Sequence, residues 1–370
     1  MPPLSVLIKP AAGLCQYRCR YCFYADVLSH REAPANAVMS PDTLEALVRK
    51  ALSYGEGSVT FSFQGGEPML AGLDFYRELI RLQKRYRRGA KILNAIQTNG
   101  GLINDEWADF FAENRFLVGL SMDGDRETHD LYRKDADGNG TFLKTEESAE
   151  MLRRRGVDFN ILCVVNRQVA SRPVETYEAL RKYGFLQFIP CIDAFDGDGP
   201  RFSPTAEEMG EFLVKTFDLY RRDIEAGEYV SVRTFDNYIQ ILNGGRPENC
   251  AMTGRCACYF VIDADGSVYP CDFYVLDEWR LGNIRQDSFA QMSRSPRAGA
   301  FVSSSVYMHP ECRTCAHYSL CRGGCRRDRE PFDDMGRPGK NKYCEGFRAF
   351  FDKRGKELRA LARRAALRGQ

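Results

Sequence analysis

The stretch that decides the fold is residues 15–24, "CQYRCRYCFY", in which three cysteines have C-x3-C-x2-C spacing. No fourth cysteine follows nearby, although a cysteine-bound metal site normally has four ligands. Sets of soft thiolates bind iron–sulfur clusters or zinc. The spacing therefore predicts either a [4Fe–4S] cluster with one iron left open, or a zinc ion completed by a distant His or Cys.

Six short apolar segments lie in the first 200 residues, and helical patterns separate most of them. The continuous apolar runs predict parallel strands buried on both faces, at 5–9, 58–63, 91–97, 116–122, 159–165 and 185–192. The helix expected at 40–52 has Ser40 as its N-cap and Pro41 at its first position. Further helices are expected at 74–86, 104–114, 173–184 and 204–226. Repeated β-α units predict a parallel sheet with fewer strands than a full TIM barrel.

Glycine-rich or polar loops follow most of these strands. The cysteine loop follows the first strand, "QGGEP" (64–68) the second, "TNG" (98–100) the third, and an acidic loop (193–204) the sixth. Functional groups of α/β folds lie at the carboxyl ends of the strands. We therefore expect these loops to meet at one rim.

The composition excludes several classes of protein. The chain has 52 basic and 50 acidic residues, which argues against a nucleic-acid footprint. It has no apolar run long enough to span a membrane, and its start lacks the basic region of a signal peptide. We expect a soluble cytoplasmic protein without membrane or nucleic-acid partners. Its 14 cysteines then indicate metal or redox chemistry rather than disulfides.

Nine of the cysteines lie between residues 250 and 344, around the run "CRTCAHYSLCRGGC" (312–325). Nine thiols could form two four-cysteine sites, of zinc or iron–sulfur type, with one thiol left over. Cys163 and Cys191 lie on predicted strands and are expected in the core.

The front motif, with Tyr21 before its last cysteine, resembles the signature of radical S-adenosylmethionine (SAM) enzymes. The resemblance implies a partial (β/α)6 TIM-type barrel and a [4Fe–4S] cluster on Cys15, Cys19 and Cys22, with SAM as the fourth ligand. It also implies SAM contacts, which are assigned to Tyr21, Gly66 of "GGEP", Ser121 of "SMDG", Arg133 of "LYRKD", and Ile192.

The cysteine-rich segment resembles a SPASM domain, which carries two auxiliary [4Fe–4S] clusters. By that pattern the first cluster is bound by Cys250, Cys256, Cys271 and Cys325. The second is bound by Cys312, Cys315, Cys321 and Cys344. Cys258 is left over, and it leaves the choice between 256 and 258 open.

Together with "FQGGEP", "LVGLSMDG" and "CRGGCRR", the segment "DGSVYPCDFYVLDEWRLGNI" (265–284) resembles the anaerobic sulfatase-maturating enzymes. That family oxidises a cysteine or serine of a sulfatase to formylglycine after a 5′-deoxyadenosyl radical removes hydrogen from Cβ. The resemblance implies that Asp272 is the base. It also implies a sulfatase with a C/S-x-P-x-R motif as the partner, and an electron donor such as flavodoxin or ferredoxin.

We expect a radical SAM barrel over 1–235, a SPASM domain over 236–348 and a basic C-terminal helix over 349–370. The runner-up function is another SPASM peptide modification, a thioether or carbon–carbon crosslink. Tyr24 and Gln64 are expected near the substrate. Asp193, Asp196 and Asp198 are hypothesised to pair with a substrate arginine, although a solvated acidic loop is the alternative.

Overall fold

The computed structural model describes residues 3–32, 37–195 and 201–368. The chain forms two compact units that interleave in sequence. The first comprises Met1–Ser121, Asp130–Asn160 and Cys258–Phe301. The second comprises Met122–His129, Ile161–Ala257 and Val302–Gln370.

The sheet of the first unit has the strand order β10-β9-β8-β1-β2-β3-β4. Neighbours from β1 to β4 are parallel, β8 pairs parallel with β1, and β8, β9 and β10 are antiparallel. The strands are β1 (Leu4–Ile8), β2 (Ser58–Phe63), β3 (Lys91–Thr98), β4 (Phe116–Ser121), β8 (Val261–Ile262), β9 (Ser267–Tyr269) and β10 (Gly282–Asn283).

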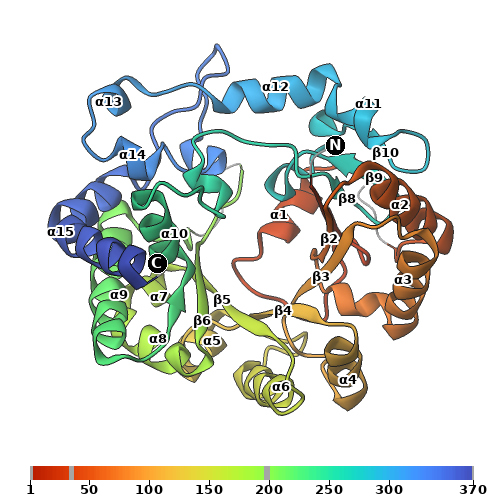
Figure 1. The fold of residues 1–370 in the computed structure, drawn as a ribbon, viewed down its shortest axis with the longest axis horizontal. Helices are drawn as coiled ribbons and strands as arrows, with labels where there is room; N and C mark the ends of the chain where they lie inside the picture. The colour runs from red at the N-terminus through yellow and green to blue at the C-terminus, as the bar shows by residue number, and fades with distance from the viewer. Residues whose placement is uncertain (1–2, 33–36, 196–200, 369–370) are drawn as a thin grey trace. The chain divides into compact units, whose positions relative to one another are not determined.

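Helices cover this sheet and build its core. They are α1 (Phe23–Ser29), α2 (Pro41–Tyr54), α3 (Leu73–Tyr86), α4 (Asp105–Glu113), α6 (Phe142–Arg154) and α11 (Phe289–Ser293). Figure 1 shows α2 and α3 side by side. Tyr76 of α3 is fully buried between Phe63 and Phe116, and edge-to-face ring contacts of this kind add to the energy of apolar burial.

The second unit holds the parallel strands β6 (Phe185–Pro190) and β7 (Ser231–Val232), and β6 pairs with β5 (Phe159–Val165). Its helices are α7 (Arg167–Ser171), α8 (Pro173–Leu180), α9 (Ala206–Ala226), α10 (Arg233–Leu242), α13 (Pro310–Arg313), α14 (Tyr318–Cys321) and α15 (Cys344–Arg368). The residues of two helices, α5 (Arg126–Tyr132) and α12 (Pro296–Ser305), are divided between the two units.

The long C-terminal helix α15 lies along α9 and also contacts α10 (Figure 1). Phe217, Phe235 and Phe350, one from each helix, are buried with ring centroids 5.2 to 5.9 Å apart. The prediction of a packed basic helix at the end of the chain is therefore confirmed, and the helix begins earlier than expected, at Cys344.

The predicted strands and helices are present. The strands at 58–63 and 159–165 have the predicted bounds. Ser40 caps α2 by accepting a hydrogen bond from the Thr43 amide at 3.3 Å. Cys163 and Cys191 are buried as expected. The short strands β7 to β10 were not predicted, because two or three residues carry no readable periodicity.

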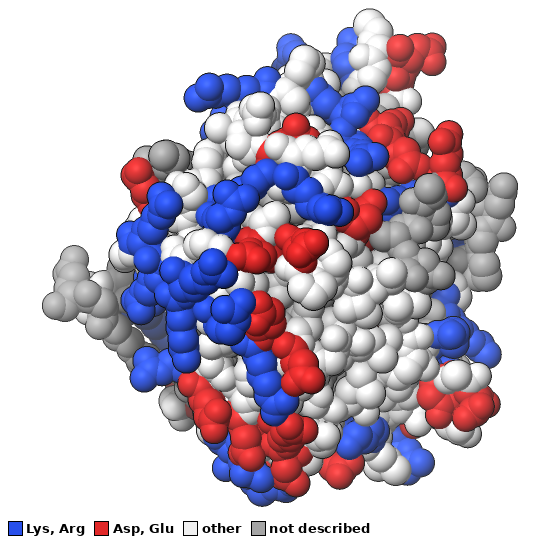
Figure 2. Space-filling model, turned by 90° about the vertical axis from the view of Figure 1, so that its right-hand side faces the viewer, with Lys and Arg blue, Asp and Glu red and all other residues white. Residues whose placement is uncertain are grey.

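Exposed charges in the first unit are paired with opposite charges. Arg77 contacts Asp74 and Glu106, and Arg81 contacts Glu78. On the face of the molecule in Figure 2, basic and acidic side chains are interspersed. None of the helices in the described residues is long and apolar enough to span a bilayer.

Candidate active site and cluster sites

The loop with the first three cysteines leaves the carboxyl end of β1 and leads into α1. The loop is tied to residues 132–135, because the Arg18 amide donates to the Lys134 carbonyl at 2.7 Å and the Arg20 amide to the Tyr132 carbonyl at 3.0 Å. Cys22 is the N-cap of α1. This frame holds the three thiols in one short loop.

The Cys15 thiol is set deepest into the protein. Its sulfur accepts hydrogen bonds from the Tyr17 amide at 3.3 Å and from Asn99 Nδ2 at 3.6 Å. Burial raises the pKa of Cys15 to about 12, and the neighbouring Cys19 and Cys22 thiols act in the same direction. A bound iron reverses this preference, since a metal cation stabilises the thiolate. The chemistry of the three thiols therefore fits a cluster.

The "GGEP" loop after β2 packs against the backbone that precedes the cysteine loop. The Gly66 amide donates to the Ala12 carbonyl at 3.0 Å, and the Glu67 amide to the Leu14 carbonyl at 2.7 Å. A Cβ on Gly66 would lie 2.1 Å from the Leu14 oxygen. The family resemblance assigns Gly66 to a SAM contact, where a glycine allows a ligand to approach the backbone closely. In the structure the close approach is made by the chain's own backbone.

Glu67 is a fully buried carboxylate that the sequence reasoning did not identify. It accepts hydrogen bonds from the Met69 amide at 3.1 Å, the Thr98 hydroxyl at 2.8 Å and the Asn99 amide at 2.9 Å. Burial raises the pKa of Glu67 to about 7 against the effect of these donors. Glu67 therefore joins the loop after β2 to the "TNG" loop after β3, as the shared rim predicts.

Two of the predicted SAM-binding residues are neighbours. The buried Arg133 guanidinium lies 5.6 Å from the ring centroid of Tyr21, in the segment that holds the cysteine loop. Ser121 is buried at the last position of β4. Ile192 belongs to the second unit, two residues beyond the end of β6.

Asp272 is the centre of a buried polar group in the first unit. Its Oδ2 accepts hydrogen bonds from the Tyr24 hydroxyl at 2.6 Å and from Gln64 Nε2 at 3.2 Å. Its Oδ1 is buried and has no hydrogen-bond partner among the described residues. Burial raises the pKa of Asp272, while Lys9 and the Tyr24 hydrogen bond lower it. One oxygen is thus fixed by two donors, and the other is buried without a partner among the described residues.

Lys9 supplies the positive charge near this carboxylate. It follows β1, is 1% exposed, and has its ammonium 4.8 Å from the ring centroid of Tyr24. The sequence contained a signal for it, because a lysine that ends an apolar strand is out of place in a core. Tyr24 and Gln64, which we expect near the substrate, contact the predicted base directly.

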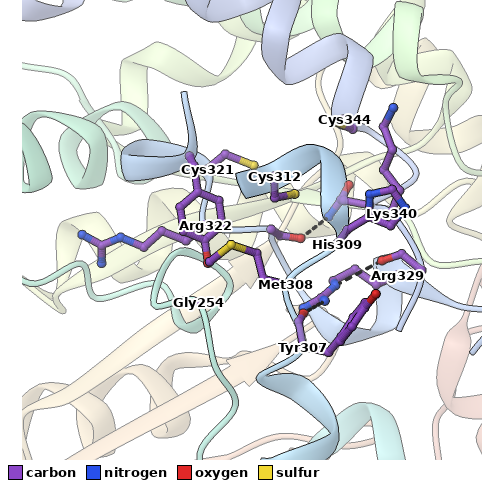
Figure 3. A pocket seen from close by; sticks show the side chains of 14 residues that line it. Gly254, Tyr307, Met308, His309, Cys312, Cys321, Arg322, Arg329, Lys340 and Cys344 are labelled. Atoms are coloured by element: carbon purple, nitrogen blue, oxygen red, sulfur yellow. Dashed lines mark hydrogen bonds between the residues drawn. The ribbon is translucent and has the colours of Figure 1, made fainter. Parts of the chain in front are cut away.

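The predicted ligands of the second auxiliary cluster surround a common space. Cys312, Cys315, Cys321 and Cys344 line one small cavity, and three of them also line a second. Figure 3 shows the second cavity from close by. Among the described residues, no three His, Cys, Asp or Glu side chains gather closely enough to hold a single metal ion. In a [4Fe–4S] cluster each thiolate binds its own iron, so thiols around a cavity fit a cluster.

The other predicted set is divided between the two units. Cys250, Cys256 and Cys325 belong to the second unit, and the Cys256 amide there is bound by the Ser305 hydroxyl at 2.8 Å. Cys258 and Cys271 belong to the first unit, and Cys271 directly precedes Asp272. Burial raises the pKa of Cys256, and the nearby Cys250 thiol acts in the same direction.

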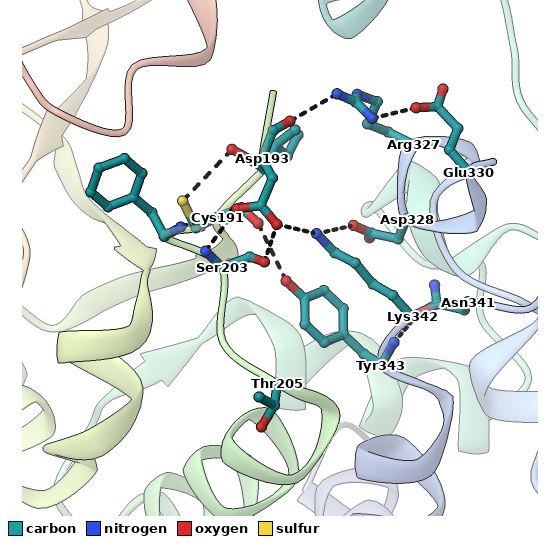
Figure 4. Close-up of polar contacts among 12 residues, drawn as sticks. Cys191, Asp193, Ser203, Thr205, Arg327, Asp328, Glu330, Asn341, Lys342 and Tyr343 are labelled. Atoms are coloured by element: carbon teal, nitrogen blue, oxygen red, sulfur yellow. Dashed lines mark hydrogen bonds and ion pairs between the residues drawn. The ribbon is translucent and has the colours of Figure 1, made fainter. Parts of the chain in front are cut away.

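Asp193, in the acidic loop, binds to residues of its own unit. Its carboxylate accepts hydrogen bonds from the Phe202 and Ser203 amides at 3.1 and 3.0 Å and from the Ser203 hydroxyl. Lys342 lies 3.7 Å away, and Arg327 donates to the Asp193 carbonyl at 2.9 Å (Figure 4). Asp193 therefore closes the loop on itself. Asp196 and Asp198 lie outside the described residues.

Comparison with known proteins agrees with this geometry. The family model of the radical SAM superfamily matches residues 11–188, and that of the SPASM iron–sulfur cluster-binding domain matches residues 250–316. The cysteine-type anaerobic sulfatase-maturating enzyme of Clostridium novyi is 44% identical over 373 residues, covering 100% of both chains. The serine-type enzyme of Bacteroides thetaiotaomicron is 33% identical, covering 94% of this chain and 89% of its own.

A solved structure, native anSMEcpe with bound AdoMet and the Cp18Cys peptide, is 41% identical and matches with a TM-score of 0.93. The match covers 98% of this chain and 100% of the other. The α/β fold, with a radical SAM domain followed by a SPASM domain, is thus confirmed. The chain belongs to the anaerobic sulfatase-maturating enzymes, a family of radical SAM oxidoreductases with an iron–sulfur SPASM domain.

Proposed function

We propose that this enzyme oxidises a cysteine of a sulfatase, within a C-x-P-x-R motif, to formylglycine. The observation that carries the proposal is the buried Asp272 carboxylate, which has one oxygen fixed by Tyr24 and Gln64 and one without a partner. Cysteine is preferred to serine as the target, because identity is 44% to a cysteine-type relative and 33% to a serine-type relative.

The chain's cysteines and polar loops hold the cofactors. Cys15, Cys19 and Cys22 would bind the cluster that SAM completes, and Tyr21, Gly66, Ser121, Arg133 and Ile192 would contact SAM. Arg133 suits a carboxylate because its guanidinium can donate two parallel hydrogen bonds. When bound, SAM and the three [4Fe–4S] clusters supply the acceptors for the hydrogen atom at Cβ and for one further electron.

The protein itself handles the proton. Conversion of a thiol to a thioaldehyde releases the thiol proton, and water then replaces sulfur to give the aldehyde. Asp272 Oδ1 would accept that proton, since it has no hydrogen-bond partner within residues 3–32, 37–195 and 201–368. Tyr24 and Gln64 would keep the carboxylate from rotating, so that Oδ1 stays toward the substrate.

The two auxiliary sets are proposed to be Cys250, Cys256, Cys271 and Cys325, and Cys312, Cys315, Cys321 and Cys344. Cys258 would be left free of iron. The boundaries of the three domains, at 235/236 and 348/349, are proposed on the same resemblance. We place the enzyme in the cytoplasm, with a flavodoxin or ferredoxin as electron donor.

The test is anaerobic incubation of the reduced, cluster-loaded enzyme with SAM and a sulfatase-derived C-x-P-x-R peptide. Mass spectrometry should show the target cysteine converted to an aldehyde, with loss of its sulfur. A product that keeps sulfur and lacks only two hydrogens would instead identify a crosslinking enzyme. The matched serine peptide measures preference, and Asp272→Asn should still form 5′-deoxyadenosine while it forms little formylglycine.

A further inference from the structure

Arg329 is a buried cation in the wall of the cysteine-lined cavity of the second unit. It ends the 3-10 turn Arg326–Arg329, is 5% exposed, and lines the same cavity as Cys312, Cys321 and Cys344 (Figure 3). No step of the proposed reaction uses it.

The hydrogen bonds of Arg329 go to backbone carbonyls. Its guanidinium donates to the carbonyls of Ser305 at 3.1 Å, Gly339 at 3.4 Å and Tyr307. Carbonyl groups satisfy its N–H donors but do not neutralise its charge. Among the described residues, no carboxylate is paired with this side chain. An arginine remains charged in proteins, and a buried charge without a counter-ion is costly.

The groups that act electrostatically on Arg329 are thiols and a tyrosine. Burial lowers the pKa of Arg329, and the Cys312, Tyr318, Cys256 and Cys325 side chains oppose that effect, in this order. Cys312 belongs to one proposed ligand set, and Cys256 and Cys325 belong to the other. The guanidinium is therefore within electrostatic range of both sets.

Lys340 offers a comparison, because it is a second cation in the wall of the same cavity. Its ammonium lies 2.8 Å from Glu311 Oε2 and 2.7 Å from Glu345 Oε1. Two carboxylates thus neutralise Lys340. Arg329 faces the cysteines without such partners.

We propose that Arg329 is the counter-charge of the two auxiliary clusters and raises their reduction potentials. This inference rests on the cluster assignment of the proposed function. A cluster gains one negative charge on reduction, so a fixed cation nearby favours the reduced form. Each auxiliary cluster would then accept an electron from the substrate more readily. Arg329 would thus act through its charge on the clusters, without touching the substrate.

The test is an anaerobic redox titration of the full-length, cluster-loaded enzyme, followed by electron paramagnetic resonance. The front cluster is recognised by the change of its signal on addition of SAM. Arg329→Met should disfavour auxiliary-cluster reduction on the order of tenfold, which is about 59 mV for a one-electron couple. Arg329→Lys, which keeps the charge, should stay near the wild-type potential. Lys340→Met, whose charge is already neutralised, should shift the potentials much less.

Unchanged potentials in Arg329→Met, or an equal shift in Lys340→Met, would overturn the inference. Iron and sulfide analysis gives a second readout for variants that load poorly. Loading in Arg329→Lys but not in Arg329→Met supports a need for charge. Failure of both variants to load would mean that the carbonyl contacts matter instead, and would refute the inference. A wild-type enzyme without auxiliary clusters would refute the cluster assignment itself, independently of these variants.

Discussion

The hydrogen bond between Tyr24 and Asp272 gives the sharpest prediction, through the variant Tyr24→Phe. The substitution removes a 2.6 Å hydrogen bond to a partly buried carboxylate and keeps the ring, which packs at a tilt on Phe23 with centroids 4.1 Å apart. Gln64 still donates to the same oxygen at 3.2 Å. Buried hydrogen bonds to charged groups are worth about 1.5–3 kcal/mol, so kcat/KM for formylglycine should fall roughly 10- to 150-fold.

The assay measures formylglycine and 5′-deoxyadenosine in the same anaerobic reaction. Because Tyr24 holds the base, formylglycine should fall further than 5′-deoxyadenosine. Loss of the hydrogen bond also raises the pKa of Asp272 further, so the acid limb of the pH profile should move to higher pH. Tyr86→Phe is the matched control, since it removes a partly buried tyrosine–carboxylate hydrogen bond to Glu45, which takes no part in the proposed reaction. Equal losses of both products, or a loss no greater than that of the control, would refute the reasoning.

Three further predictions concern the frame around the site. Gly66→Ala places a Cβ 2.1 Å from a backbone oxygen, so SAM binding measured by equilibrium dialysis should weaken roughly 5- to 150-fold, whereas Gly299→Ala, with open space, should not change it. Arg31→Met breaks a buried 2.6 Å ion pair with Asp263 and should cost about 3–5 kcal/mol in urea unfolding. The double variant with Asp263→Asn should recover part of that loss, and simple additivity would argue against direct coupling. Burial raises the pKa of Glu67 from 4.5 to about 7. The folded protein therefore binds this proton more tightly than the unfolded chain. The resulting contribution to folding stability is complete below pH 4.5 and is lost as the pH rises through 7. The wild-type urea midpoint should therefore fall between pH 5 and pH 8 more than that of Glu67→Gln, and parallel pH profiles would contradict the assignment.

The sequence carried most of the architecture because its local signals agree with the fold. The Ser40 cap of α2 is a property of neighbouring residues and was predictable, whereas β2, expected to be buried on both faces, alternates between buried and half-buried positions. The cysteine spacing likewise predicts metal sites from residues that are close in sequence, and the ligand sets stay predictions. Local sequence patterns therefore predicted the features whose determining residues are close in sequence.

The buried charges could not be predicted in the same way. Glu67 and Arg329 are polar residues whose burial is explained by partners that adjoin other segments of the chain. The contacts of Asp193 with the Phe202 and Ser203 amides and with Lys342 were likewise not predicted, and its pairing with a substrate arginine stays a hypothesis. Sequence periodicity describes which face of an element is apolar, and it contains no record of such long-range pairing.

The pairing of β1 with β8 has a consequence for how the protein is made. Leu7 and Ile8 lie opposite Val261 and Ile262, so the strand that carries the front cysteine loop gains one of its neighbours from a segment synthesised much later. Contacts of such long sequence separation form slowly, because a large loop must close first. During translation, the front cysteines therefore leave the ribosome well before their final surroundings exist. Cluster loading at this site should therefore follow synthesis of the hairpin at 261–269. The length of the nascent chain would then determine when the iron–sulfur cluster can be inserted.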